Sequence, residues 1–341
     1  MEPVRFAIVS PARWGRLLLD AARETPMLSF AGVASGTRSN ADAVAHDYGG
    51  RVYPSYEALL ADPTIEAILL PTPHHLHYPQ AMAAFAAGKH VFVEKPIAVT
   101  IAEAETMQQE SERRGLVLAV DHPGRRTGGA RLAKRLIDEG RLGAIVSAVA
   151  IHGAPLEPRS NEDWKFSAEV VPGGPLDQLG PHYADLMHYL LGPIRNVSSY
   201  VRDDVTPFSA PDAAIASFRF ASGVIGVYVT HQVAGYVSSL TIFGVAGALR
   251  IERFGQELFW QDRTPTQAAQ AGEGGWRPIP VAGPAPSTTA LTEALDEFAR
   301  CIRTGARAEV GAAEGIAALR VMRAALDSAQ IGRVIELAVE Q

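Results

Sequence analysis

The sequence predicts two joined domains: an α/β domain with a doubly wound parallel sheet, and an α+β domain with a large, mostly antiparallel open sheet. Strand-like and helix-like runs alternate over roughly the first 120 residues, as in a parallel sheet covered on both faces. Beyond them the runs become long and β-rich with short turns between them, as in antiparallel sheets. The chain of 341 residues is long enough for both, and we expect domains over residues 1–122 and 123–341.

In the first domain, a compact apolar run predicts a strand over residues 4–9, and apolar side chains at helical spacing predict a helix over 15–25. The same alternation then repeats along the chain. The further strands are expected over residues 28–34, 67–70, 90–93 and 117–120, and the further helices over residues 40–48, 78–87 and 101–114.

In the second domain, a first helix is expected over residues 131–139, followed by a series of β-branched or alternating runs that read as a meander. These strands are expected over residues 144–151, 197–201, 213–220, 224–233, 238–243 and 248–251. A stretch rich in Gly and Pro, residues 272–286, predicts a loop before helices over 291–303 and 312–329.

The composition of the chain disfavours several classes of function. The net charge of −6 and the lack of a basic run disfavour nucleic acid as a partner. Cys301 is the single cysteine, which excludes a disulfide framework and a cysteine-based metal site. No apolar run approaches the roughly 20 residues of a membrane span, and no leader precedes the first strand, so we expect a cytoplasmic protein with no membrane partner.

The first strand is followed by a turn that matches the dinucleotide fingerprint G-x-G-x-x-G only as S-x-A-x-x-G. A small residue in the middle still lets a pyrophosphate approach the backbone, and the last glycine still permits close packing of helix on strand. Because the surrounding elements alternate as in dinucleotide-binding domains, we expect cofactor contacts here. The candidates are Ser10, Ala12, Arg13, Trp14 and Gly15.

The second strand ends without the acidic residue that bonds ribose hydroxyls in NAD-binding domains. Ser35, Thr37 and Arg38 stand there instead, and no carboxylate follows until Asp42. An arginine with flanking hydroxyls suits a 2′-phosphate, so the cofactor expected is NADP, with NAD as the second choice. The alternative is a solvated arginine that opens a helix.

Two loops at later strand ends complete the expected cofactor side. The loop at residues 71–77 holds three histidines, but no acid or cysteine lies near, so we expect no metal and place Pro71, Thr72 and His75 beside the nicotinamide, with His77, a further candidate contact, starting the next helix. Asp121, His122 and Pro123, which close the sixth strand, either belong to the same crevice, with His122 on its substrate side, or form a turn.

The fifth strand ends in Glu94, Lys95 and Pro96. Since the carboxyl ends of parallel strands form the ligand crevice, a lysine there either binds or catalyses. The alternative is a surface lysine paired with Glu94, but Pro96 restricts the backbone of Lys95 and argues against it. In the second domain, Pro175 suits the first turn of a helix on which Gln178, His182 and Asp185 share one face, either solvated or turned to a cleft.

Three stretches, residues 87–96, 173–185 and 328–334, resemble the Gfo/Idh/MocA family of glucose-fructose oxidoreductase and inositol dehydrogenase. The resemblance implies that Lys95 is catalytic, that the Lys95–Pro96 bond is commonly cis, and that His182 is the family's histidine. The family's aspartate, four residues before that histidine, is Gln178 here. Asp177 next to it is five residues from His182, about 140° round a helix, and an amide leaves His182 less basic than a carboxylate would.

We therefore expect an NADP-preferring dehydrogenase that moves hydride between nicotinamide C4 and a hydroxyl-bearing carbon of a sugar or cyclitol. His182 is the expected general base, Lys95 stabilises the alkoxide, and Glu94 fixes Lys95. The expected substrate contacts are Gln178, Asp185, Tyr183, Trp164, Lys165 and His122.

Two other functions stay open: a weak or inactive nucleotide or sugar sensor that acts through a protein partner, and a hydrolase-like or epimerase-like relative that recycles NAD. The open face of the second sheet predicts a homodimer or homotetramer, since it would otherwise expose an apolar patch.

Overall fold

The computed structural model describes residues 1–158, 163–264, 274–281 and 287–338. The chain forms two compact units: Met1–Pro123 with Ser287–Leu319, and Gly124–Pro286 with Arg320–Gln341. The first boundary lies one residue from the division drawn from sequence. The sequence-based division keeps residues 287–319 with the second domain, whereas here they pack within the first unit.

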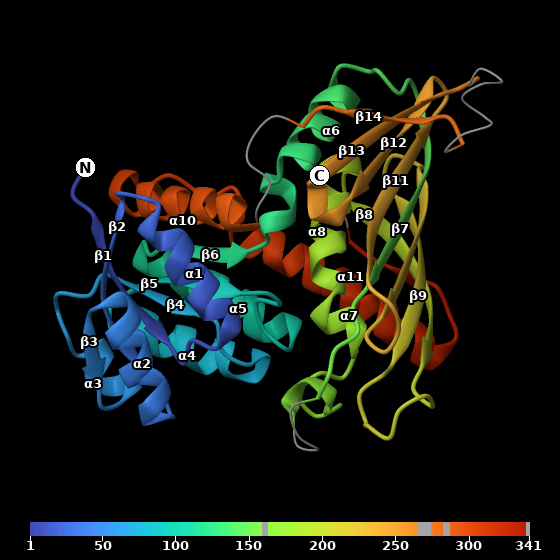
Figure 1. The fold of residues 1–341 in the computed structure, drawn as a ribbon. Coiled ribbons are helices and arrows are strands. Elements are labelled where there is room, and N and C mark those ends of the chain that lie inside the picture. The colour runs from blue at the N-terminus through green and yellow to red at the C-terminus, as the bar shows by residue number, and fades with distance from the viewer. Residues whose placement is uncertain (159–162, 265–273, 282–286, 339–341) are drawn as a thin grey trace. The chain divides into compact units, whose positions relative to one another are not determined.

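The sheet of the first unit has the strand order β3-β2-β1-β4-β5-β6, and every pair in it is parallel (Figure 1). Its strands are β1 Val4–Val9, β2 Leu28–Ala34, β3 Arg51–Tyr53, β4 Ala67–Leu70, β5 His90–Glu94 and β6 Leu118–Asp121. Its connecting helices are α1 Arg13–Arg23, α2 Arg38–Tyr48, α3 Tyr56–Leu60, α4 His74–Ala86 and α5 Ile101–Arg114. The ranges of β3 and α3 were not predicted, because elements this short show no periodicity.

Alternation along β1 explains why helices cover both faces of this sheet. Ala7 and Val9 enter one core together with Phe85 of α4, while Phe6 and Ile8 enter the opposite core together with Leu18 of α1. Helix α10 (Ser287–Thr304) packs beside α1 on the second of these faces (Figure 1). The ring of Phe298 on α10 lies 5.6 Å from that of Phe92, which anchors this late helix to the parallel sheet.

The second unit has a mixed sheet of order β14-β13-β12-β11-β7-β10-β9-β8-β15. Its strands are β7 Ile145–Gly153, β8 Ile194–Arg202, β9 Ala213–Phe220, β10 Ile225–His231, β11 Val237–Gly244, β12 Gly247–Glu252, β13 Glu257–Asp262, β14 Trp276–Ile279 and β15 Ile335–Glu336. The meander expected from sequence is wrong at one point: β7 lies between β10 and β11 and runs parallel to β10. A strand from the start of the domain can be inserted there because pairing depends on long-range packing, which short turns do not report.

The other elements of this unit are α6 Gly128–Asp138, α7 Pro175–Gln178, α8 Gly180–Leu191 and α11 Ala312–Ile331, with short 3₁₀ turns η1 Pro123–Arg126, η2 Trp164–Phe166 and η3 Arg253–Gly255. Both η1 and α11 cross a boundary between the units. None of the described helices has the length and apolar character needed to cross a membrane.

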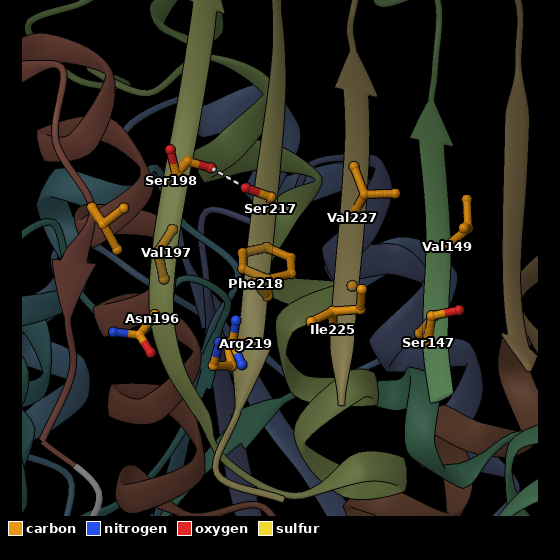
Figure 2. Close-up of a pocket in the computed structure, with 13 residues that line it drawn as sticks. Ser147, Val149, Asn196, Val197, Ser198, Ser217, Phe218, Arg219, Ile225 and Val227 are labelled. Carbon is orange, nitrogen blue, oxygen red and sulfur yellow. Dashed lines mark hydrogen bonds between the residues drawn. The ribbon is translucent and has the colours of Figure 1, made fainter. Parts of the chain in front are cut away.

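The two faces of this sheet differ. On one face Tyr228 is fully buried and stacks on Tyr183 of α8, so the helices cover that side. The strand register places Tyr200, Ile215, Ile225 and Phe243 on the opposite face, where they are 81%, 50%, 51% and 37% exposed. We call this side the open face; Figure 2 shows its central part, with Val149 and Val227 on neighbouring strands.

Candidate active site

The predicted cofactor-side residues come together at one edge of the parallel sheet. Each follows or ends a strand: Ser10 after β1, Ser35 after β2, Pro71 after β4, Lys95 after β5 and His122 after β6. Because parallel strands all end at the same edge, residues from five parts of the chain share this position. This edge is therefore the candidate nucleotide site of the first unit.

The turn after β1 has a tight backbone with little room for side chains. Ser10 has a positive φ of 47°, a conformation that glycine takes without strain. A Cβ at Gly15 would lie 2.6 Å from Cβ of Pro11 and 3.0 Å from Cγ of Pro71, so only glycine fits there. Among the described residues no side chain caps α1, whose N-cap residue is Ala12, and its first N–H groups suit an anion.

The residues expected to bind a 2′-phosphate lie in the next turn. Arg38 begins α2 with its side chain 75% exposed, and its Nε donates to Oδ1 of Asp42 at 2.8 Å. The backbone N–H of Thr37 donates to Oγ of Ser35 at 3.2 Å. An exposed i,i+4 ion pair contributes only about 0.3–0.5 kcal/mol, so the bond to Asp42 leaves Arg38 able to turn to a stronger anion.

The loop after β4 corrects two expectations. Helix α4 begins at His74, not at His77. The imidazole of His77 is fully buried, with Nδ1 2.9 Å from the carbonyl oxygen of Pro96 and Nε2 2.8 Å from that of Thr72. Burial lowers its pKa to about 4, although the two carbonyls favour the charged form. The ring therefore joins the loop to Pro96 and is not exposed to a cofactor or metal.

Of the remaining loop residues, some are buried and bonded within the protein and others are exposed. Oγ1 of Thr72 donates to Oε1 of Gln80 at 2.6 Å and is buried, whereas His75 is exposed and Pro71 half-buried. His122, at the end of β6, is buried. Within the described ranges, no group of three or more His, Cys, Asp or Glu side chains could hold a metal ion.

Lys95 is half-buried at the end of β5, and the Lys95–Pro96 peptide is cis. Glu94 is buried beside Asp121, the last residue of the neighbouring strand β6. The pairing of Asp121 with Glu94 was not predicted. A signal was present, because two adjacent parallel strands each end in an acid.

In the second unit the expected polar row on one helix is interrupted. Helix α7 ends at Gln178 and α8 begins at Gly180, so Gln178 and His182 do not share one regular helix. Asp185 is 1% exposed and accepts two bonds from Arg125, Nε to Oδ2 at 3.0 Å and Nη2 to Oδ1 at 2.5 Å. The expected substrate contact of Asp185 is replaced by a buried ion pair.

Two other predicted substrate residues, Gln178 and Tyr183, also use their side chains for contacts within the protein. Nε2 of Gln178 donates to the carbonyl of Lys165 at 2.6 Å and to Oε1 of Gln232 at 3.2 Å. The hydroxyl of Tyr183 lies 3.0 Å from Oγ of Ser238, and burial raises the pKa of Tyr183. Gln178 thus supports the segment that carries Lys165, and Tyr183 belongs to the core.

Asp177, the acid next to Gln178, also has partners within the protein. It accepts a hydrogen bond from the backbone N–H of Gly173 at 2.7 Å and forms an ion pair with Arg323. Trp164 and Lys165 are half-buried in η2, where Nζ of Lys165 lies 5.8 Å from the centre of the Trp164 ring.

His182 is half-buried and lies among aromatic rings. The ring centre of His152 is 6.0 Å away and that of Phe254 5.6 Å away, the latter edge-on. His152 is on the buried face of β7, and Phe254 has a positive φ of 55°. Neither was predicted: alternation along β7 could have pointed to His152, whereas no local pattern marks Phe254.

The first unit, with its β3-β2-β1-β4-β5-β6 order and its turn at residues 10–15, defines the class as a dinucleotide-binding oxidoreductase. The family model "Oxidoreductase family, NAD-binding Rossmann fold" matches residues 4–122, and "GFO/IDH/MocA C-terminal domain" matches residues 130–250. The chain belongs to the Gfo/Idh/MocA family and is an NAD(P)-dependent dehydrogenase or reductase acting on CH–OH groups.

Two relatives match this chain over most of both lengths. Levoglucosan dehydrogenase of Pseudarthrobacter phenanthrenivorans is 28% identical over 80% of each chain, and scyllo-inositol 2-dehydrogenase (NADP(+)) of Bacillus subtilis is 27% identical over 88% of this chain and 87% of the relative. Among solved structures, aldose-aldose oxidoreductase from Caulobacter crescentus has a TM-score of 0.88 at 23% identity, covering 98% of this chain and 100% of that one. This structural likeness confirms the fold.

Proposed function

We propose that the protein is an NADP-preferring dehydrogenase that moves hydride between nicotinamide C4 and a hydroxyl-bearing carbon of a sugar or cyclitol. The observation that carries the proposal is the shared carboxyl edge of the parallel sheet, where Lys95 and the turn at residues 10–15 both lie. Two relatives support the substrate class, since their names make them dehydrogenases of levoglucosan and of scyllo-inositol.

Each part of the edge has a role in this proposal. The backbone of residues 10–15 and the first turn of α1 hold the pyrophosphate, and Ser35, Thr37 and Arg38 hold the 2′-phosphate. The nicotinamide, when bound, supplies the hydride chemistry. Lys95 donates a hydrogen bond to the substrate oxygen and stabilises negative charge that develops there.

In the second unit, His182 accepts the hydroxyl proton in oxidation and returns it in reduction. Its half-buried imidazole is held in place by the rings of His152 and Phe254. Trp164 and Lys165 line the substrate pocket in this proposal. The amide of Gln178, which stands where the family has an aspartate, donates to the backbone carbonyl of Lys165.

The cofactor preference is tested by titrating the purified, nucleotide-free protein with NADPH and NADH and following reduced-nicotinamide fluorescence. We expect NADPH to bind tighter, and Arg38→Ala to narrow the preference by about tenfold, or roughly 1.4 kcal/mol, because one charge-assisted contact is lost. Arg113→Ala removes another exposed arginine, 64% exposed against 75% for Arg38, from a surface pair on α5 and should leave the NADPH-to-NADH affinity ratio unchanged. An unchanged ratio in Arg38→Ala would place phosphate recognition elsewhere, and binding of neither cofactor would favour the sensor.

The open face supports a further part of this proposal, self-association into a homodimer or homotetramer. Figure 2 shows the neighbouring strands β8, β9, β10 and β7 side by side, with Oγ of Ser217 donating to the carbonyl of Ser198 at 3.3 Å. A sheet face of this kind can pair with its own copy about a two-fold axis. Two copies would cover exposed apolar side chains such as Ile215 and Ile225.

A charge at the centre of the open face should therefore separate the subunits. We expect Ile225→Asp to shift the molar mass in sedimentation equilibrium towards that of one chain, because a carboxylate would be buried at the interface. Val205→Asp is the matched control: Val205 is 52% exposed, against 51% for Ile225, and lies in the loop after β8. A wild-type protein that sediments as one chain at micromolar concentration would contradict this part of the proposal.

A further inference from the structure

Two buried acids lie side by side at the end of the strand that carries Lys95. Glu94 ends β5, Asp121 ends β6, and the two are register partners in the parallel sheet. Paired positions of neighbouring strands point to the same face, so the two carboxyl groups are neighbours. Glu94 is 9% exposed and Asp121 1% exposed.

The oxygens of this pair are incompletely satisfied. Nε1 of Trp14 donates to Oδ2 of Asp121 at 2.9 Å. Oε1 of Glu94 and Oδ1 of Asp121 are buried, and neither has a hydrogen-bond donor among the described residues. An ionised carboxylate is only an acceptor, so two ionised groups could not satisfy each other, whereas one proton between them supplies the missing donor.

Electrostatics favour the same arrangement. Burial first, and then the neighbouring Asp121, raise the pKa of Glu94 well above its usual range, while Lys95 and the indole of Trp14 oppose the shift. The indole N–H of Trp14 donates to Asp121, whereas Oε1 of Glu94 has no donor among the described residues, so we place the shared proton on Glu94. The pair then carries one negative charge beside the one positive charge of Lys95.

We propose that Glu94 and Asp121 share one proton and act as a single-charge counter-ion that positions the ammonium group of Lys95. Two full charges in this buried place would be costly, whereas a single charge still attracts the ammonium group of Lys95. Trp14 belongs to the first turn of α1, so the same network joins the cofactor turn to Lys95. The role assigned to Lys95 rests on the proposed function; the shared proton does not.

Amide substitutions separate the two charge states. Glu94→Gln and Asp121→Asn each remove one titrating group, supply an N–H donor and leave one carboxylate. The double variant leaves none. If the pair shares a proton, both single variants keep the single charge and lose the protonated carboxyl group; if both acids are ionised, each substitution removes one charge.

The test is an infrared difference spectrum at pH 7 of wild type minus each single variant. We expect a protonated-carboxyl band in both differences, and its absence in both would overturn the proposal. This readout needs neither cofactor nor substrate, so a failure of the proposed function does not affect it. In turnover, the double variant should have a kcat at least about tenfold below that of either single variant, whereas equal stepwise losses would indicate two ionised acids.

The stability of the single variants gives a second measurement that does not depend on the double variant folding. Because the folded-state pKa of Glu94 is raised, the folded state holds a proton that the unfolded chain has released. The free energy of unfolding should therefore fall as pH rises through that raised pKa. The groups acting on Glu94 are Asp121 on β6, Lys95 after β5 and the neutral indole of Trp14 on α1. Glu94→Gln should flatten this fall, and an unchanged pH profile would contradict the shared proton.

Discussion

Replacing Lys95 with alanine is expected to lower kcat by about 10²–10⁴-fold while NADPH binding stays measurable. The half-buried lysine follows β5 at the carboxyl edge of the parallel sheet, where its ammonium group would meet the reacting oxygen. Alanine removes the donor that stabilises charge on that oxygen, a contact that strengthens in the transition state. Steady-state kinetics on polyol or sugar substrates, alongside fluorescence titration with NADPH, separate catalysis from binding.

The matched control is Lys134→Ala, which removes another half-buried lysine, paired with Asp138 on α6. Its kcat should stay close to that of wild type. Normal turnover in Lys95→Ala would remove Lys95 from the mechanism. Loss of NADPH binding in the same variant would instead give the lysine a role in holding the cofactor.

The largest stability effect is expected at Asp185. Asparagine there leaves the guanidinium of Arg125, which is 9% exposed in its side chain, with a neutral partner in a buried place. Removing one partner of a buried ion pair costs about 3–5 kcal/mol, so we expect a decrease of that size in the free energy of unfolding. Urea denaturation followed by circular dichroism measures it.

Asp138→Asn provides the comparison, since its exposed pair with Lys134 should contribute less than about 1 kcal/mol. The double variant Asp185→Leu with Arg125→Met should recover much of the stability, because no buried charge is left unpaired. If Asp185→Asn instead kept the stability of wild type and raised KM, Asp185 would be a substrate contact, as the sequence predicts.

Asp185 also shows which contacts a sequence pattern cannot predict. Spacing predicts that Gln178, His182 and Asp185 share a helix face, and it assumes one continuous helix. The break at Leu179 separates Gln178 from the other two. Asp185 then pairs with Arg125, sixty positions earlier in the chain, a partner that no local pattern can reveal.

Other predictions needed only local chemistry. Alternating apolar runs and turns predicted the parallel sheet, which the structure confirms. The missing acid after the second strand predicts that Arg38 binds a 2′-phosphate, and this stays a prediction. His77 was expected to start a helix and contact the cofactor, because a histidine's sequence neighbours do not show that two carbonyls face its ring.

The sequence by itself determined the class of fold, the family and the strand end that carries Lys95, because each depends on periodicity, turn residues or a contiguous motif. Only the tertiary structure decided which polar side chains bond to other parts of the protein. It also decided where β7 lies in its sheet and that Glu94 and Asp121 are neighbours. These depend on contacts between residues far apart in the chain, whose free energies are set by burial and pairing and leave no local pattern.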